Sequence, residues 1–128
     1  MSEQTLSVSI KVEEDHLACA MGSGSLMVLA TPAVIAFMEN AASSLADNII
    51  NNDELTTVGT SISIDHISPT PLGAEVTATA ILKETNGKIF NFDVVAKDKK
   101  GEIARGTHTR VLVKSANFQI KADEKFYE

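Results

Sequence analysis

The chain has 128 residues, the length of one domain, and we expect a single domain with its core at about residues 5–118 and a charged tail at 119–128. Its formal net charge of −6 argues against nucleic-acid binding, which needs concentrated positive charge, and its 44% hydrophobic content argues against disorder. The longest stretch without a charged side chain, from Leu17 to Met38, is interrupted by glycine and proline, so we expect no membrane span.

The cellular compartment is suggested by the cysteine content and by the first residues. Cys19 is the only cysteine, so the chain cannot form an intramolecular disulfide, which fits a reducing compartment. The first four residues lack the basic region and apolar core that begin a signal peptide. We therefore expect a cytoplasmic protein.

The first half of the chain predicts a strand, an irregular stretch and a long helix. Apolar and polar residues alternate over Leu6–Val12, as in a half-buried strand. The next stretch carries a Gly-Ser-Gly-Ser loop signal, after which Leu26–Leu29 can form a short strand. Thr31 is a favoured N-cap and Pro32 suits the first helical turn. The helix that follows is apolar almost all round up to an Asn-Asn-Asp cluster, which predicts a buried helix.

The second half predicts strands separated by turns. The runs rich in strand-forming residues cover about Leu55–Ile67, Glu75–Glu84, Ile89–Lys97 and Ile103–Ser115. The Asn86-Gly87 pair marks a tight hairpin, and tight turns join antiparallel neighbours. We therefore predict an α+β domain in which a four-strand meander wraps the helix. The tail from Lys121 onward is charged and is expected to fray.

Glu39 is the only ionisable side chain between Thr31 and Ala46. A carboxylate on a buried helix is unfavourable unless it is paired, hydrogen-bonded or protonated. One interpretation places it on a narrow polar stripe with Asn40 and Ser43, or in a pair with a distant lysine. The other makes it a general base, or a group that orients one, with a pKa tuned by burial.

His66 and Thr31 each have a structural and a functional interpretation. By the period of two, His66 lies on the same strand face as Ile62 and Ile64, where it is either a satisfied core residue or a catalyst beside a loop. Thr31 is explained as an N-cap, but a hydroxyl at a helix N-terminus is also well placed beside a developing oxyanion.

Gly59, His108 and Arg110 are the remaining candidates. Gly59 indicates a strand bulge, a close approach of a ligand to the backbone, or both. His108 and Arg110 share one strand face as cross-strand partners or as contacts at the mouth of a ligand site, and we favour the structural role. Zinc-ligand spacing, a phosphate-binding glycine loop and a GxSxG elbow are missing from the sequence, so we expect neither a metal nor a separate cofactor.

An ordered set of these residues resembles one family. It comprises Thr31 and Glu39 eight residues apart, Gly59 and His66 seven apart, the segment Asp65–Gly73 ending in Pro-x-Gly, and the Gly-Thr-His-Thr-Arg segment that ends at Arg110. Over roughly residues 5–118 this set is similar to the fluoroacetyl-CoA thioesterase family of hotdog proteins.

The resemblance implies a hotdog fold and a homodimer that hydrolyses a small acyl-CoA to a carboxylate and free CoA. It implies that Thr31, Glu39 and His66 are catalytic and that Gly59 shapes the acyl site, with His108 and Arg110 as further candidates for substrate binding. The chain is 5% aromatic and has no tryptophan, whereas the family's fluorine-selective member gates its pocket with aromatic residues. We therefore expect an acyl group other than fluoroacetyl.

The spacing of the helical candidates constrains the mechanism. Eight helical residues separate Thr31 from Glu39 by about 12 Å along the axis, so the two side chains cannot form a direct pair within a regular helix. Either the substrate lies between them, or Thr31 of one subunit meets Glu39 or His66 of the other across a twofold axis. Such a site would require the dimer.

Three other functions are compatible with the predicted fold, since a fold does not determine a function. A non-catalytic acyl-CoA sensing module would need the pocket but not converging catalytic groups. A dehydratase acting on acyl thioesters is disfavoured because no Asp stands five residues before any of the three histidines. A purely structural interaction protein would leave Glu39 unexplained.

Overall fold

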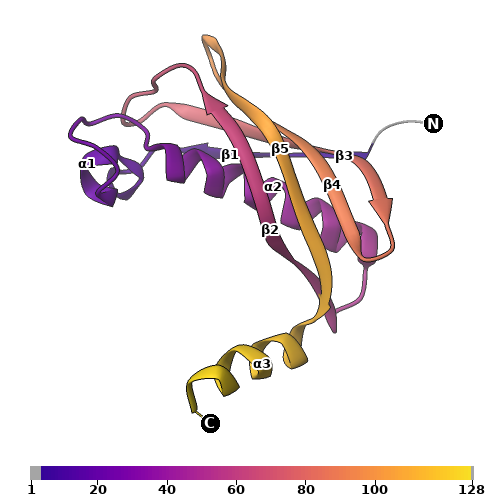
Figure 1. Cartoon of the computed structure of the whole chain (residues 1–128). Helices are drawn as coiled ribbons and strands as arrows, with labels where there is room; N and C mark the ends of the chain where they lie inside the picture. The colour runs from indigo at the N-terminus through magenta and orange to yellow at the C-terminus, as the bar shows by residue number, and fades with distance from the viewer. Residues whose placement is uncertain (1–3, 128) are drawn as a thin grey trace.

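The structure is a computed structural model that describes residues 4–127 (Figure 1). Residues 1–3, part of the segment tested for a signal peptide, and Glu128, the end of the predicted tail, lie outside the described residues. The elements are β1 (Gln4–Lys11), η1 (Glu14–His16), α1 (Ala18–Met21), α2 (Thr31–Ile50), β2 (Leu55–His66), β3 (Glu75–Asn86), β4 (Ile89–Asp98), β5 (Gly101–Lys114) and α3 (Ser115–Tyr127).

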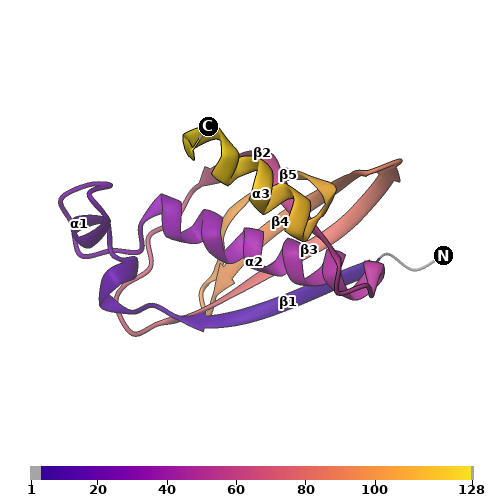
Figure 2. The same cartoon turned by 90° about the horizontal axis from the view of Figure 1, so that it is seen from below.

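One antiparallel sheet curves around α2, which confirms the predicted α+β architecture (Figures 1 and 2). The strand order is β1-β3-β4-β5-β2, with every neighbouring pair antiparallel. The predicted four-strand meander is wrong, because β2 pairs with β5 at the far edge and only β3, β4 and β5 follow one another. The eight residues between β2 and β3 include Pro69 and Pro71, which prevent a tight hairpin and let the chain cross to the other side of the sheet.

The core lies between α2 and the sheet. The buried residues of α2 recur at helical spacing, and small side chains dominate among them, which allows a close approach of helix and sheet. They are Ala33, Val34, Phe37, Met38, Ala41, Ala42, Leu45 and Ala46. Alternating residues of β3 and β4, such as Val76, Ala78, Phe92 and Val94, cover this stripe from the sheet side. The opposite side of α2 is only partly covered, so the helix is less completely buried than its sequence predicts.

The start of α2 differs from the prediction. Ala30, not Thr31, is the N-cap, and Thr31 is the first helical residue. The N-cap prediction for Thr31 is therefore wrong. The Thr31 hydroxyl instead contacts a residue of β2, so it does not act as a local helix cap.

Two segments are more ordered than expected. The stretch after β1 contains η1 and α1, and the possible strand at Leu26–Leu29 is reduced to single bridges that Val28 and Leu29 form with Pro71 and Leu17. The charged tail is not frayed but continues from β5 as α3, all of whose described residues are exposed or only partly buried. Helix-favouring residues dominate this segment and form a helix despite its charge, so the expectation of fraying is wrong. Among the described helices, none is long and apolar enough to cross a membrane.

The hairpin between β3 and β4 turns over two residues, Gly87 and Lys88. Gly87 has a positive φ of 63°, as the Asn86-Gly87 signal predicts. Gly106 is required for a steric reason. A side-chain Cβ at this position would come 1.9 Å from the carbonyl oxygen of Ser63. Strands β2 and β5 can pair at this point only because position 106 has no side chain.

Candidate functional site

The hydroxyl of Thr31 and the imidazole of His66 form a hydrogen bond within one chain. Thr31 Oγ1 lies 2.8 Å from His66 Nδ1, at the point where the first residue of α2 meets the last residue of β2. His66 belongs to the face of β2 that carries Ile62 and Ile64, as predicted, with exposed Ser63 and Asp65 between them. Thr31 therefore reaches His66 within its own chain, so this contact does not need the dimer that the helix spacing suggested.

The environment of His66 favours the neutral imidazole. Burial lowers the pKa of His66 below its ordinary value of 6.5, and the nearby backbone of Ser68 opposes that shift without forming a full hydrogen bond to the ring. Its Nε2 is inaccessible to solvent and has no hydrogen-bond partner among the described residues. A buried polar atom without a partner is uncommon in folded proteins and indicates that another group completes the site.

Thr31 and His66 line a pocket of about 300 Å³ beside the loop that follows β2. Ala30 O accepts hydrogen bonds from the N–H groups of Ala33 and Val34, at 3.0 and 3.1 Å, and Pro32 has no N–H. Within residues 4–127 no acceptor is found for the Thr31 N–H. Of the amides in the first turn, this one has no described acceptor, and it belongs to a residue that lines the pocket.

Glu39, His108 and Arg110 converge on Gly59. A Cβ added to Gly59 would lie 3.1 Å from Glu39 Oε2, 3.2 Å from His108 Cε1 and 3.4 Å from Arg110 Nη1. The ladder between β2 and β5 shifts register between Gly59 and Ser61, so the predicted bulge is confirmed. Glu39 is half-buried rather than fully buried as predicted. The missing side chain at Gly59 leaves the carboxylate room between helix and sheet.

His108 is held as a neutral acceptor for Arg110. His108 Nδ1 lies 2.8 Å from the carbonyl oxygen of Ser61, which can only accept, so Nδ1 carries the proton. Arg110 Nη1 then donates to His108 Nε2 at 3.2 Å. Burial lowers the pKa of His108, and the nearby Arg110 charge lowers it further, against the effects of Ser61 and Glu39. Both ring nitrogens are occupied within the chain, which is compatible with the structural role that we favoured for His108, although the residue is buried and not on the sheet surface.

Arg110 is buried, with 7% of its surface exposed, and Thr57 anchors it. Its Nε donates to Thr57 Oγ1 at 2.8 Å and its Nη2 to Thr57 O at 2.9 Å. Burial lowers the pKa of Arg110, and the carboxylates of Glu39 and Asp47 oppose that shift. Sequence reasoning missed Thr57, although the period of two places it on the same face of β2 as Gly59.

The predicted residues thus form two clusters within one chain. Thr31 and His66 lie at the start of α2, while Glu39, Gly59, His108 and Arg110 lie near its middle, about 12 Å away along the axis. As the spacing predicts, Glu39 forms no pair with Thr31. No group of three or more His, Cys, Asp or Glu side chains in residues 4–127 is arranged to hold a metal ion.

Comparison with known proteins relates this chain to thioesterases. The model of the fluoroacetyl-CoA-specific thioesterase (FlK) family matches residues 12–116. The fluoroacetyl-CoA thioesterase of Streptantibioticus cattleyicolor is 37% identical over 68 residues, which are 53% of this chain and 49% of that protein. This match therefore spans about half the length of that curated relative.

Solved structures extend the similarity to nearly the whole fold. A crystal structure of an FlK variant in complex with fluoroacetate and CoA is 26% identical, covers 93% of this chain and 97% of its own, and has a TM-score of 0.85. A hot-dog-like protein from Thermanaerovibrio acidaminovorans is 21% identical, covers 97% of this chain and 91% of its own, and also has a TM-score of 0.85. Together these likenesses confirm the predicted hotdog fold.

Proposed function

This chain belongs to the fluoroacetyl-CoA-specific thioesterase (FlK) family, and we propose that it hydrolyses a small acyl-CoA to a carboxylate and free CoA. The observation that carries the proposal is the Thr31–His66 hydrogen bond in a pocket at the start of α2. A hydroxyl within hydrogen-bond reach of a neutral imidazole is the arrangement of an activated nucleophile. Because burial lowers the pKa of His66, the ring can accept a proton at neutral pH.

In the proposed reaction, Thr31 Oγ1 attacks the thioester carbonyl while its proton moves to His66 Nδ1. The Thr31 N–H donates to the oxyanion of the tetrahedral intermediate. When the C–S bond breaks, the CoA thiolate takes the proton from His66 and leaves. Water then attacks the acyl ester and gives one proton to His66. As the bond between the acyl carbon and Thr31 Oγ1 breaks, His66 passes that proton to Oγ1, and the released carboxylic acid loses its proton to solvent to give the carboxylate.

Glu39 enters this scheme from a second copy of the chain. His66 Nε2 is buried without a partner, and Glu39 of the same chain belongs to a cluster elsewhere on α2. In the homodimer, we place the carboxylate of the second copy's Glu39 as the acceptor of the Nε2 proton. That contact would hold Nδ1 as the proton acceptor, in the way that a triad carboxylate orients its histidine.

The edge strand β2 supports a homodimer as the working unit. Its outer side has no pairing strand in the described chain, and it carries Gly59 and His66 as well as the half-buried Ile62 and Ile64. An unpaired strand edge is a ready surface for pairing with another chain. A twofold contact along β2 would bring the clusters of two copies toward each other.

Thiol release from a panel of short, branched and aromatic acyl-CoAs tests the activity, with Glu39→Gln as the paired variant. Turnover of at least one substrate by the wild type, with a large loss in the variant, is expected. Tight binding of an acyl-CoA without turnover would instead indicate a sensing module. Mass spectrometry of a quenched reaction should show the acyl group on Thr31, and turnover with neither a burst nor an acylated residue would indicate direct attack by water.

A mixing experiment tests whether two subunits share each site. Thr31→Val and Glu39→Gln are each expected to be inactive as homodimers. After subunit exchange in equal amounts, half of the dimers are mixed and each contains one intact shared site, which predicts about a quarter of wild-type activity. Sites formed within single subunits would give no recovery, because each subunit in the mixture carries a defect.

A further inference from the structure

A basic groove borders the Thr31–His66 pocket. It has a volume of about 1120 Å³ and lies between the loop that follows β2 and the turn that joins β4 to β5. Ser68 and Pro69 line both the groove and the pocket, so the two are neighbours. Lys97, Lys99 and Lys100 line the groove, a local concentration of cations in a chain whose net charge is −6.

The three lysines are available to a ligand. All are exposed, and none forms an ion pair with another described residue, although Lys97 lies opposite Glu102 on β5 and its charge helps to lower the pKa of that carboxyl. Two carboxylates, those of Asp98 and Glu75, also line the groove. Asp98 is used by the fold, because its Oδ2 accepts from Thr70 Oγ1 at 2.9 Å and its Oδ1 accepts from the Lys100 N–H at 2.8 Å. These bonds hold the turn in place but do not neutralise Asp98, so three lysines and two carboxylates give the groove lining a net charge of +1.

The separation of the lysines from His66 matches the length of a pantetheine arm. His66 pairs with Ala104 of β5, and Ala104 pairs with Ala96 of β4, so two strand spacings of about 5 Å separate His66 from Ala96. Lys99 lies three residues further along, about 10 Å in the strand direction, which gives a diagonal of about 14 Å. About 13 bonds join the sulfur of a CoA thioester to its nearest phosphorus, an extended reach of about 15 Å.

We propose, on the basis of the proposed thioesterase function, that Lys97, Lys99 and Lys100 bind the phosphate groups of the CoA moiety while the thioester lies beside Thr31. The groove is large enough for a nucleotide, and ammonium groups bind phosphates by charge and by multiple N–H donors. The occupant is free acyl-CoA. A carrier protein would present a single phosphate on its pantetheine and would need a protein surface to dock on.

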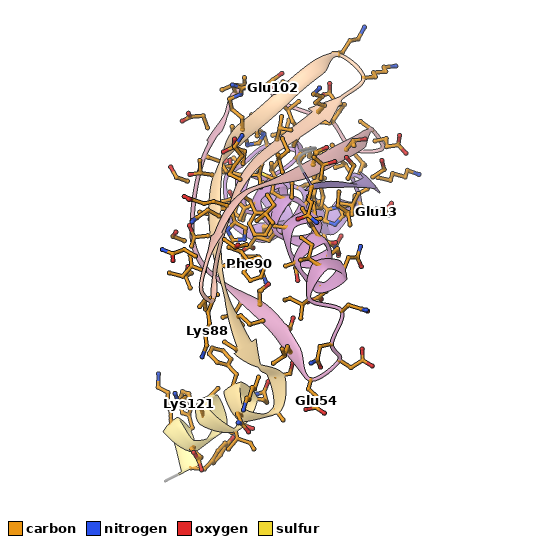
Figure 3. The ribbon with its side chains drawn as sticks, turned by 90° about the vertical axis from the view of Figure 1, so that its right-hand side faces the viewer. Glu13, Glu54, Lys88, Phe90, Glu102 and Lys121 are labelled. Atoms are coloured by element: carbon orange, nitrogen blue, oxygen red, sulfur yellow. The ribbon has the colours of Figure 1, made fainter. Side chains whose placement is uncertain are left out.

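The test compares three substrates with the same acyl group: acyl-CoA, its 3′-dephospho analogue and acyl-pantetheine. The triple variant Lys97→Gln, Lys99→Gln, Lys100→Gln is compared with wild type and with the control Lys88→Gln, Lys121→Gln, Lys125→Gln, which has the same net charge. Glu102 follows the β4–β5 turn that carries the groove lysines. Lys88 and Lys121 lie toward the opposite end of the molecule from it (Figure 3).

For the groove variant we expect KM for acyl-CoA to rise about tenfold or more, with kcat unchanged and KM for acyl-pantetheine unchanged. The control variant should match wild type on all three substrates. An equal KM for acyl-CoA and acyl-pantetheine in the wild type would overturn the inference. A carrier-protein thioester hydrolysed at a lower KM than acyl-CoA would also overturn it.

Binding of free CoA, measured by calorimetry on the intact protein, separates this inference from the proposed function. In one outcome, the affinity for CoA falls in the groove variant but not in the control, and no thioester is cleaved by the wild type. This outcome would support the phosphate site and refute the thioesterase. In the opposite outcome, all three proteins cleave acyl-CoA with the same kinetic constants and bind CoA with equal affinity. This outcome would refute the phosphate site and support the thioesterase.

Discussion

Thr31 Oγ1 and His66 Nδ1 lie 2.8 Å apart although 35 residues separate them in the chain. The contact joins the first residue of α2 to the last residue of the edge strand β2, so the fold brings together two segments that do not follow each other in the sheet. It leaves Nε2 of the same imidazole buried and unpartnered. The proposed roles of Thr31 as nucleophile and His66 as base rest on this one relationship.

Replacing Thr31 by valine should abolish most of the activity without unfolding the protein. Valine has a similar shape but cannot donate to His66, and Thr31 is exposed, so little packing is lost. We expect kcat to fall about 10²-fold or more, the usual size of an acid–base contribution, while Thr31→Ser retains measurable turnover. Thiol-release kinetics and a thermal melt check both parts. Wild-type kcat in Thr31→Val would refute the proposed nucleophile.

Gly59→Ala should disturb the central cluster. The new Cβ would come within 3.1–3.4 Å of Glu39, His108 and Arg110, and the last two are held by hydrogen bonds and cannot move freely. We expect a loss of about 1 kcal/mol in unfolding free energy together with a fall in kcat/KM. The matched control is Gly24→Ala, whose Cβ meets its nearest neighbour at an ordinary 3.6 Å. Urea titration and kinetics on both variants measure the difference, and equal behaviour would contradict the crowding argument.

Thr57→Val should destabilise the fold through Arg110. The substitution removes the oxygen that accepts from Arg110 Nε and leaves a buried cationic donor without that partner. An unsatisfied donor on a charged group costs about 1–3 kcal/mol, whereas Thr57→Ser keeps the hydroxyl and should lose much less. Chemical denaturation of the three proteins gives the comparison. Equal losses in the two variants would assign the effect to side-chain packing.

The activity should fall in acid with a midpoint below pH 6.5. The proposed base is neutral His66, whose pKa is lowered from 6.5 by burial, so protonation removes the acceptor only below that value. The logarithm of kcat against pH should therefore be flat near neutrality and decline on the acid side. A midpoint above 6.5 would show that burial does not control the pKa of His66 in the working dimer, where the carboxylate of the second copy's Glu39 favours the charged ring.

Stability should also decline as the pH falls through this range. The unfolded chain binds protons at histidine near pH 6.5, while His66 and His108 bind them only at lower pH in the folded protein, so the unfolded state gains protons first. Their contribution is complete above pH 6.5 and is lost as the pH drops toward the folded pKa values. Melting temperatures between pH 7.5 and 5.5 should fall more steeply for wild type than for His66→Gln, and parallel curves would contradict the linkage.

Much of the fold was predictable because local patterns encode it. The alternation in β1, β3 and β4, the apolar length of α2 and the glycine turn after β3 follow from side-chain periodicity and backbone sterics. The position of β2 was not predictable in the same way. Strand order depends on long-range pairing, and the residues between β2 and β3 indicate only that no tight turn joins them.

The same distinction applies to the candidate site, whose residues could be predicted but whose contacts could not. The sequence by itself determined which residues are chemically unusual: a lone carboxylate on an apolar helix, a glycine within a strand and a histidine at a strand end. Only the tertiary structure decided their partners, placing Thr31 against His66 and directing Glu39 toward Gly59, His108 and Arg110. The reason is physical, since residue type and periodicity specify a face of one element, whereas a hydrogen bond between distant elements depends on how those faces pack.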